Sequence, residues 1–186
     1  MENIWRINMF IELLENRRSL RKYKDRPVEK EKIDLLVEAA LRAPSSRGLN
    51  PWEFIVVSDR KLLAELAGCK PHGASFLKTA PLGIIVLADP NRCDVWVEDC
   101  SIASIFVHLA AHSLGLGSCW IQVRKRMYDQ KTSAGQYIAA CLDIPDGLEV
   151  ESIVAVGYPD GMLPGHLREN LAYRKVHENR YGDAFE

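Results

Sequence analysis

The segment from Arg17 to Tyr23 gathers residue types that suit phosphate binding. Within seven positions it holds four cations and one serine hydroxyl, namely Arg17, Arg18, Ser19, Arg21 and Lys22. It follows an apolar repeat with the spacing of one helix face, at Ile4, Ile7, Ile11 and Leu14. A guanidinium binds phosphate oxygens through a bidentate fork. The segment therefore suits a phosphate site, and taken alone it fits a solvated basic run equally well.

A loop rich in hydrogen-bonding groups follows, from Ala43 to Pro51. Pro44 and Pro51 restrict its backbone, and Trp52 anchors it to the apolar run that comes next. Its polar side chains offer both donors and acceptors, and they are those of Ser45, Ser46 and Asn50. Such a loop could lie against a polar heterocycle, and a simple helix end before a strand fits equally well.

A third segment runs from Leu114 to Gln122 and contains Gly115 and Gly117. Glycine allows a ligand to approach the backbone closely. Taken alone, the pattern is more typical of a helix end that leads into a strand.

Together and in this order, the three segments resemble the nitroreductase family of FMN-dependent oxidoreductases, from about Arg17 to Gly182. The resemblance implies an α+β fold of nitroreductase type. Three layers are expected, with helices flanking a central sheet that is mixed and mainly antiparallel. The chain would be one FMN-binding domain over residues 1–186 and would form a homodimer. Residues 160–186 would be a C-terminal tail that wraps the partner subunit.

The resemblance also implies which residues hold FMN at the subunit interface. The phosphate and ribityl chain would meet Arg17, Arg18 (through its backbone), Ser19 and Arg21, with Arg168, Arg174 or Lys175 as a further contact. The flavin would be reached from the other subunit by Pro44, Ser45, Ser46 and Asn50. The ring would lie near Trp120, Ile121 and Gln122. The family commonly has Asn in place of Gly48 and Gln in place of Asn50, and many members carry a lysine in the region that corresponds to residues 73–76.

The activity implied is hydride transfer from NADH or NADPH, through flavin N5, to an electron-poor small molecule such as a nitroaromatic or a quinone. The two half-reactions need no protein acid or base, so no catalytic residue is assigned. Two alternatives stay open: a flavin-binding storage or regulatory module without useful turnover, and a sibling flavin-dependent dehalogenase. Residues 124–126 could meet the 2′-phosphate of NADPH or form a solvated turn.

Composition limits the other classes of function. The chain has 186 residues, a formal net charge of -1 and 47% hydrophobic residues. These values are typical of one soluble domain and argue against a nucleic-acid or membrane binder. No secretory signal or membrane-length apolar segment is visible, and five scattered cysteines lack zinc spacing. We therefore expect reduced thiols in a cytoplasmic protein, with no bound metal.

Apolar periodicity predicts helices over 3–15, 27–42, 60–67, 94–114 and 131–142, with Pro27 opening the second of these. It predicts strands over 54–57, 84–87, 119–121 and 153–157. One face of the long helix is expected to present Ile102, Ile105, Phe106, Leu109 and Ser113. Asp94, Glu98 and Asp99 at its start are interpreted as complements to the helix dipole. His108 and His112 are expected to pack, and Cys119 is not expected to be a catalytic thiol.

Overall fold

Every expected helix and strand is present, with shifted ends. The computed structural model describes residues 2–185, and their side chains from residue 9 onward, so Ile4 and Ile7 lie outside the described side chains. The helices are α1 Glu2–Asn16, α2 Lys30–Leu41, α3 Arg60–Leu66, α4 Trp96–Ser113 and α5 Ala134–Cys141. The strands are β1 Trp52–Val57, β2 Leu82–Ala88, β3 Gly117–Gln122 and β4 Glu149–Gly157.

The strands form one sheet in the order β1-β2-β4-β3. Each neighbouring pair is antiparallel, and parallel pairing among the described residues is confined to a bridge between Ser19 and Ser118. The expected α+β class is confirmed, and its sheet is antiparallel rather than mixed. Because β1 and β3 are the two edge strands, each leaves one row of peptide groups unpaired by the sheet.

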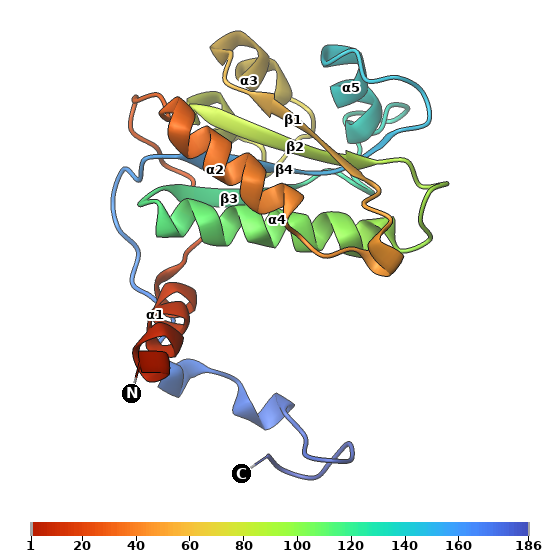
Figure 1. Ribbon diagram of the computed structural model, residues 1–186. Helices are drawn as coiled ribbons and strands as arrows, with labels where there is room; N and C mark the ends of the chain where they lie inside the picture. The colour runs from red at the N-terminus through yellow and green to blue at the C-terminus, as the bar shows by residue number, and fades with distance from the viewer. Residues whose placement is uncertain (1, 186) are drawn as a thin grey trace. The chain divides into compact units, whose positions relative to one another are not determined.

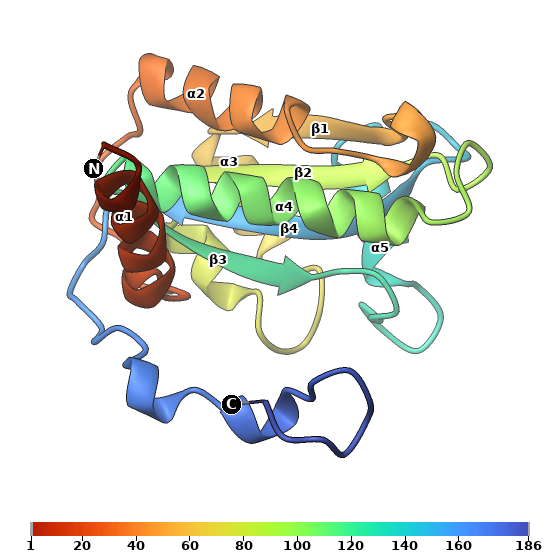
Figure 2. The ribbon, with the colours of Figure 1, turned by 60° about the horizontal axis from the view of Figure 1, so that its bottom comes forward.

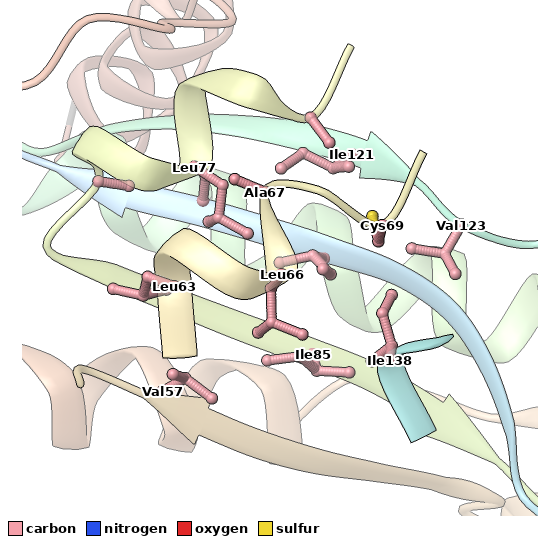
Figure 3. Packing of buried hydrophobic residues seen from close by; sticks show 14 of the residues in the cluster. Val57, Leu63, Leu66, Ala67, Cys69, Leu77, Ile85, Ile121, Val123 and Ile138 are labelled. Atoms are coloured by element: carbon pink, nitrogen blue, oxygen red, sulfur yellow. The ribbon is translucent and has the colours of Figure 1, made fainter. Parts of the chain in front are cut away.

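Helices cover both faces of the sheet, which confirms the expected three layers (Figure 1). On one face, α2 and α4 pack on the sheet through buried side chains that include Leu36, Ala40, Val107 and Ala111. On the other face, α3 and α5 supply Leu63, Leu66 and Ile138, which cluster with Ile85 and Ile121 of the sheet (Figure 3). No helix among residues 2–185 is long and apolar enough to cross a membrane.

Helix α4 packs on the sheet through small residues. Ala103, Val107 and Ala111 are fully buried, whereas Ile105 is 42% exposed. The expected helix face that includes Ile105 therefore does not pack on the sheet. Small side chains let the helix backbone approach the strands closely, and this proximity matters for the polar groups described below.

Helix α2 begins at Lys30, three residues after the expected start at Pro27. A network at this end fixes the entry of the chain into the helix. The Tyr158 hydroxyl donates to Glu29, whereas Lys32 Nζ donates to the Tyr158 hydroxyl at 3.0 Å and to the Leu114 carbonyl at 2.8 Å. Glu29 is extended at the N-cap position because these contacts hold it outside the helix.

The chain divides into two units. Residues 18–163 form the sheet and its covering helices, and the second unit joins residues 2–17 to residues 164–185. In the second unit, His166 N donates to the Glu15 carbonyl at 2.8 Å. A pocket of about 490 Å³ in that unit is lined by Ile11, Leu14, Leu171 and Tyr173, among others. The unit also exposes large apolar side chains, including Phe10, Leu167 and Leu171.

A bulge in β4 changes the direction in which the Glu151 side chain points. The β2–β4 register shifts so that Val86 faces Ser152 and Leu87 faces Val150, which leaves Glu151 as the extra residue. Glu151 is 2% exposed, and its Oε2 atom has no hydrogen-bond partner among the described residues. Burial raises the pKa of Glu151 to about 7, against the opposing effects of a Ser152 hydrogen bond and the Arg124 charge.

This shift predicts how stability depends on pH. The pKa of Glu151 is about 7 in the folded chain and has an ordinary value of 4.5, so its ionisation penalises folding progressively as pH rises between these values. Glu151→Gln should therefore gain stability relative to the wild type between pH 4 and pH 8, by an amount on the order of 3 kcal/mol. Urea unfolding at both pH values measures it. Glu149→Gln, at an exposed site on the same strand, is the control, and a gain for Glu151→Gln that does not change with pH would contradict the assignment.

Candidate functional site

The free edge of β3 presents a row of peptide groups. Leu20 N donates to the Ser118 carbonyl at 2.9 Å, and Lys70 Nζ donates to the Gln122 carbonyl at 2.6 Å. Both carbonyls therefore point away from β4. Because alternate residues of a strand direct their peptide groups to the same side, the N–H groups of Trp120 and Gln122 face this edge as well. The edge therefore presents peptide N–H donors, in the plane of the sheet, between the Ser118 carbonyl bound by Leu20 and the Gln122 carbonyl bound by Lys70.

The basic segment lies across one end of this edge as a strap, here residues 18–24. Ser19 bridges to Ser118, and Lys24 N donates to the Tyr158 carbonyl at 2.9 Å. The hydroxyl of buried Tyr23 donates to the Leu20 carbonyl at 2.6 Å and to the Ala155 carbonyl at 3.3 Å. The strap is thus fixed to the ends of both β3 and β4.

Gly117 is required by the strap rather than by a ligand. A Cβ atom there would lie 2.6 Å from Leu20 Cδ1 and 3.1 Å from Leu20 Cβ. Gly115 has φ of +72° where α4 ends. The pair of glycines therefore serves a helix end and a close chain crossing, and the interpretation of Gly117 as an opening for a ligand is not supported.

Cations gather beside the strap. A depression of about 330 Å³ is lined by Arg21, Lys22, Ser75, Phe76, Lys78 and Thr79, with Tyr23 and the Asp160 carboxylate. The Arg21 guanidinium lies 5.8 Å from the centre of the Phe76 ring. Three cations and two hydroxyls against one carboxylate suit an anionic group.

Lys70 is a candidate site residue that the sequence interpretation did not name. It is half-buried on the loop after α3, and burial lowers its pKa. Residues 73–76 lack the lysine that many family members carry there, and Lys70 places a cation at the far end of the β3 edge. Its bond joins residues 52 positions apart in the chain, so no local motif marks it.

The side chains of β3 divide between two faces. Trp120 Nε1 donates to Gln122 Oε1 at 3.0 Å, and Gln122 Nε2 donates to the Arg124 carbonyl at 3.0 Å. Ile121 is fully buried in the core under α3 and α5. The Ile121 side chain therefore supports the strand and does not line the edge. The expected place of Ile121 near the ring stays a prediction.

His108 packs as expected, with Nδ1 at 2.7 Å from Ser118 Oγ in a buried contact. Cys119 is 1% exposed, which does not suit a catalytic thiol. Within residues 2–185, no group of three or more His, Cys, Asp or Glu side chains could hold a metal ion.

The loop after α2, residues 44–50, adopts an unusual backbone. Arg47, Gly48 and Asn50 have φ of +54°, +64° and +45°. Ser45 Oγ donates to Asn50 Oδ1 at 2.7 Å and accepts from Asn50 N at 2.9 Å. The polar groups singled out in the sequence thus close the loop on itself.

Asp99 was interpreted as a complement to the helix dipole, and the structure gives it another role. It is 2% exposed and accepts a hydrogen bond from Ser46 N at 2.9 Å. Asp94 lies before α4 and pairs with Arg47. The acidic start of α4 therefore binds the loop at two points.

One chain does not bring this loop to the β3 edge. The loop enters β1 at Trp52, which pairs with Ala88, whereas the strap meets β3 at Ser118, which pairs with Val156. Strand spacing and rise place these points roughly 20–25 Å apart, diagonally across the sheet. Figure 2 shows β1 and β3 on opposite edges.

The remaining expected phosphate contacts belong to the other unit. These residues are Arg17, Arg168, Arg174 and Lys175. Arg168 lines the pocket of that unit. Their contact with a phosphate stays a prediction, whereas Arg18, Ser19 and Arg21 lie on the strap itself.

Comparisons with known proteins agree on one family. The model of the Nitroreductase family matches residues 14–69 and 68–158. The structure of an FMN-dependent nitroreductase from Clostridium difficile is 51% identical, with a TM-score of 0.91, and the match covers 92% of this chain and 99% of that one. A protein from Methanothermobacter thermautotrophicus, with the provisional name NADH dehydrogenase/NAD(P)H nitroreductase, is 41% identical over 80% of this chain and 76% of its own length. An FMN reductase (NADPH) from Bacillus subtilis is 29% identical over 94% of this chain and 75% of its own length.

The packing of the strap can be tested at Gly117. Gly117→Ala should lower the free energy of unfolding by about 1–3 kcal/mol, because its methyl group overlaps the Leu20 side chain. In a Leu20→Ala background the same change should cost less, since the nearest atoms are gone. Urea unfolding of the four proteins in this double-mutant cycle gives the coupling, and additive effects would show that the crossing is not tight.

Proposed function

The chain belongs to the nitroreductase family, and on that premise we propose that it is an FMN-dependent oxidoreductase that takes hydride from NADH or NADPH. The open edge of β3 carries the proposal. Its peptide donors lie between the cations of the strap and the ammonium of Lys70. The names of the C. difficile and B. subtilis relatives support FMN as the cofactor.

The residues present fit this cofactor. Ser118 and Gln122 are four residues apart on β3, which corresponds to about 13 Å of strand. A phosphate would be held near Arg21, which lines the cationic depression, with Arg18 and Ser19 on the same strap as further contacts. Peptide N–H groups of Trp120 and Gln122 would donate to acceptor atoms on the edge of the flavin ring. A flavin supplies hydride acceptance and release at N5.

The protein contributes binding, orientation and charge. Lys70 would place a cation near the edge of the ring, where it favours the negative charge that develops on reduction. Its hydrogen bond to the Gln122 carbonyl holds the ammonium in place before a ligand arrives. No side chain of the chain is assigned as a general acid or base, in keeping with a reaction in which the cofactor carries the chemistry.

A second copy of the chain would complete the site. Residues Pro44, Ser45, Ser46 and Asn50 are too far from the strap of their own chain to share one ligand with it, so we assign them to the flavin of the partner. The exposed apolar side chains of residues 9–14 and of the tail, residues 160–186, would be covered in a homodimer whose tail wraps the other subunit. Arg17 and Arg168 would then approach the phosphate.

Gly48 departs from the family pattern without disturbing the loop. Its φ of +64° lies in the left-handed region that glycine and asparagine both adopt readily. A Cβ atom there would meet nothing within 4 Å. Glycine at position 48 removes a side chain near the proposed ligand but preserves the backbone conformation of the loop. This supports the proposal that the loop still binds flavin.

The acceptor is proposed to be an electron-poor small molecule, such as a nitroaromatic or a quinone, that follows the nicotinamide into the same open site. Arg124 is half-buried, with its guanidinium 5.6 Å from the centre of the Trp96 ring, and Lys125 and Arg126 are exposed. These cations allow NADPH as well as NADH. Five free cysteines, four of them buried, agree with a reducing compartment such as the cytoplasm.

The visible spectrum tests the proposal directly. Purified protein, or protein reconstituted with FMN and gel-filtered, should absorb near about 370 and 450 nm and should bleach on anaerobic addition of NADH or NADPH.

Arg21→Ala should raise the Kd for FMN at least tenfold, whereas Lys24→Ala, at an exposed cation on the same strap, should change it little. A protein that takes up no flavin would refute the proposal. Bound flavin that neither nucleotide reduces would favour the storage module, and iodide or bromide release from a halotyrosine would favour the dehalogenase.

Lys70 gives a separate test of charge at the ring. Lys70→Met should lower the reduction potential of bound FMN by about 30 mV or more, because 30 mV corresponds to a tenfold change in a two-electron equilibrium. Lys125→Met, at an exposed cation in the turn after β3, is the matched control. Equal potentials in the wild type and both variants would remove Lys70 from the site.

A further inference from the structure

We infer that Asp99 of α4 is a positioning residue for flavin binding, since its carboxylate holds loop 44–50 in the conformation that it presents to the ligand. The inference rests on the proposed function, in which this loop contacts FMN. Asp99 itself touches only protein: Ser46 N at 2.9 Å from Oδ1, and Cys93 Sγ at 3.4 Å from Oδ2.

Both carboxylate oxygens of Asp99 are engaged, and the side chain is 2% exposed. A hydrogen bond from a peptide N–H to a carboxylate is stronger than one between neutral groups. Burial excludes the water that would compete for the Ser46 N–H group. The acceptor is therefore fixed in position by the helix that carries it.

Loop 44–50 needs contacts from the rest of the domain to keep its conformation. Arg47 and Asn50 have positive φ values of +54° and +45°, which residues with a side chain adopt only at a cost in free energy. The Ser45–Asn50 hydrogen bonds close the loop but do not attach it to the rest of the domain. Conformations of this kind persist where surrounding contacts impose them.

The other attachment is weaker. Arg47 pairs with Asp94 and lies 4.0 Å from Cys93 Sγ, but the Arg47 and Asp94 side chains are 63% and 78% exposed, and exposed ion pairs contribute little. Asp99 accepts the N–H of the peptide that links Ser45 to Ser46, directly before the first left-handed residue, Arg47. Without it, only a fraction of molecules would hold the binding-competent loop, and the apparent affinity would fall by that fraction.

Three variants of the full-length protein test the inference: Asp99→Ala, Asp99→Asn and the surface control Asp94→Ala. FMN is titrated by quenching of its fluorescence. Asp99→Ala should raise the Kd at least tenfold. Asp99→Asn should stay within threefold of the wild type because its Oδ1 still accepts the Ser46 N–H, and Asp94→Ala should also stay within threefold. Unchanged affinity in Asp99→Ala, or an equal loss in Asp99→Asn, would overturn the inference.

A second pair of variants keeps Asp99 and compares loss of the donor, in Ser46→Pro, with its retention, in Ser46→Ala. Ser46 begins a short 3-10 helix, Ser46–Gly48, and the preceding Ser45 is extended with φ of −137° and ψ of 157°, which suits a residue before proline. A proline at position 46 replaces the N–H group by a ring carbon, which cannot donate and which also meets Asp99 Oδ1. Ser46→Pro should bind FMN at least tenfold more weakly than Ser46→Ala, which loses only the hydroxyl. Equal affinities of these two variants would contradict a role for the peptide hydrogen bond.

Hydrogen exchange separates this inference from the proposed function. In Asp99→Ala without ligand, amides of residues 45–50 should exchange at least tenfold faster than in Asp94→Ala, with the amides of β2 unchanged. If wild-type protein binds no FMN, the proposed function fails while this measurement still reports on Asp99. If FMN binds and the loop amides are unaffected by Asp99→Ala, the inference alone fails.

Discussion

The seating of the strap on the free edge of β3 is the constraint on which the candidate site depends. An edge strand exposes peptide groups that must find partners, and here one end of the edge is occupied by Leu20 and the other by Lys70. The stretch between them is left open to a ligand. The absence of a side chain at Gly117 and the buried hydroxyl of Tyr23 allow the strap to lie close enough for this arrangement.

The layer between α4 and the sheet contains several buried polar side chains. Ser104 Oγ lies 3.3 Å from Ser152 Oγ, and Asp99 and Glu151 are both buried nearby in the same layer. The two acids differ in their partners: Asp99 is fully engaged, whereas one oxygen of Glu151 is not. Burying an ionised carboxylate costs free energy. For Asp99 the hydrogen bonds to its carboxylate offset this cost, whereas Glu151 lowers the stability of the fold at neutral pH.

The separation of the strap from loop 44–50 has a consequence for assembly. Two surfaces with matching chemistry lie diagonally across one sheet, and a single small ligand cannot join them within a chain. Pairing of two copies about a twofold axis would bring each loop to the other strap.

The sequence alone predicted the main helices and strands, because these follow from local periodicity and turn residues. The family, and with it the α+β class, followed from the resemblance carried by three motifs in a fixed order. Arg18, Ser19 and Arg21 could be proposed from the sequence because the basic residues of the strap are contiguous. The contacts of Lys70 and Asp99 could not, since each joins residues about fifty positions apart. The direction of a side chain within β3 also depended on register, which buried Ile121 and left the peptide groups on either side of it at the free edge. Only tertiary structure decides such contacts, because they depend on which strand lies at an edge and which segments pack beside it.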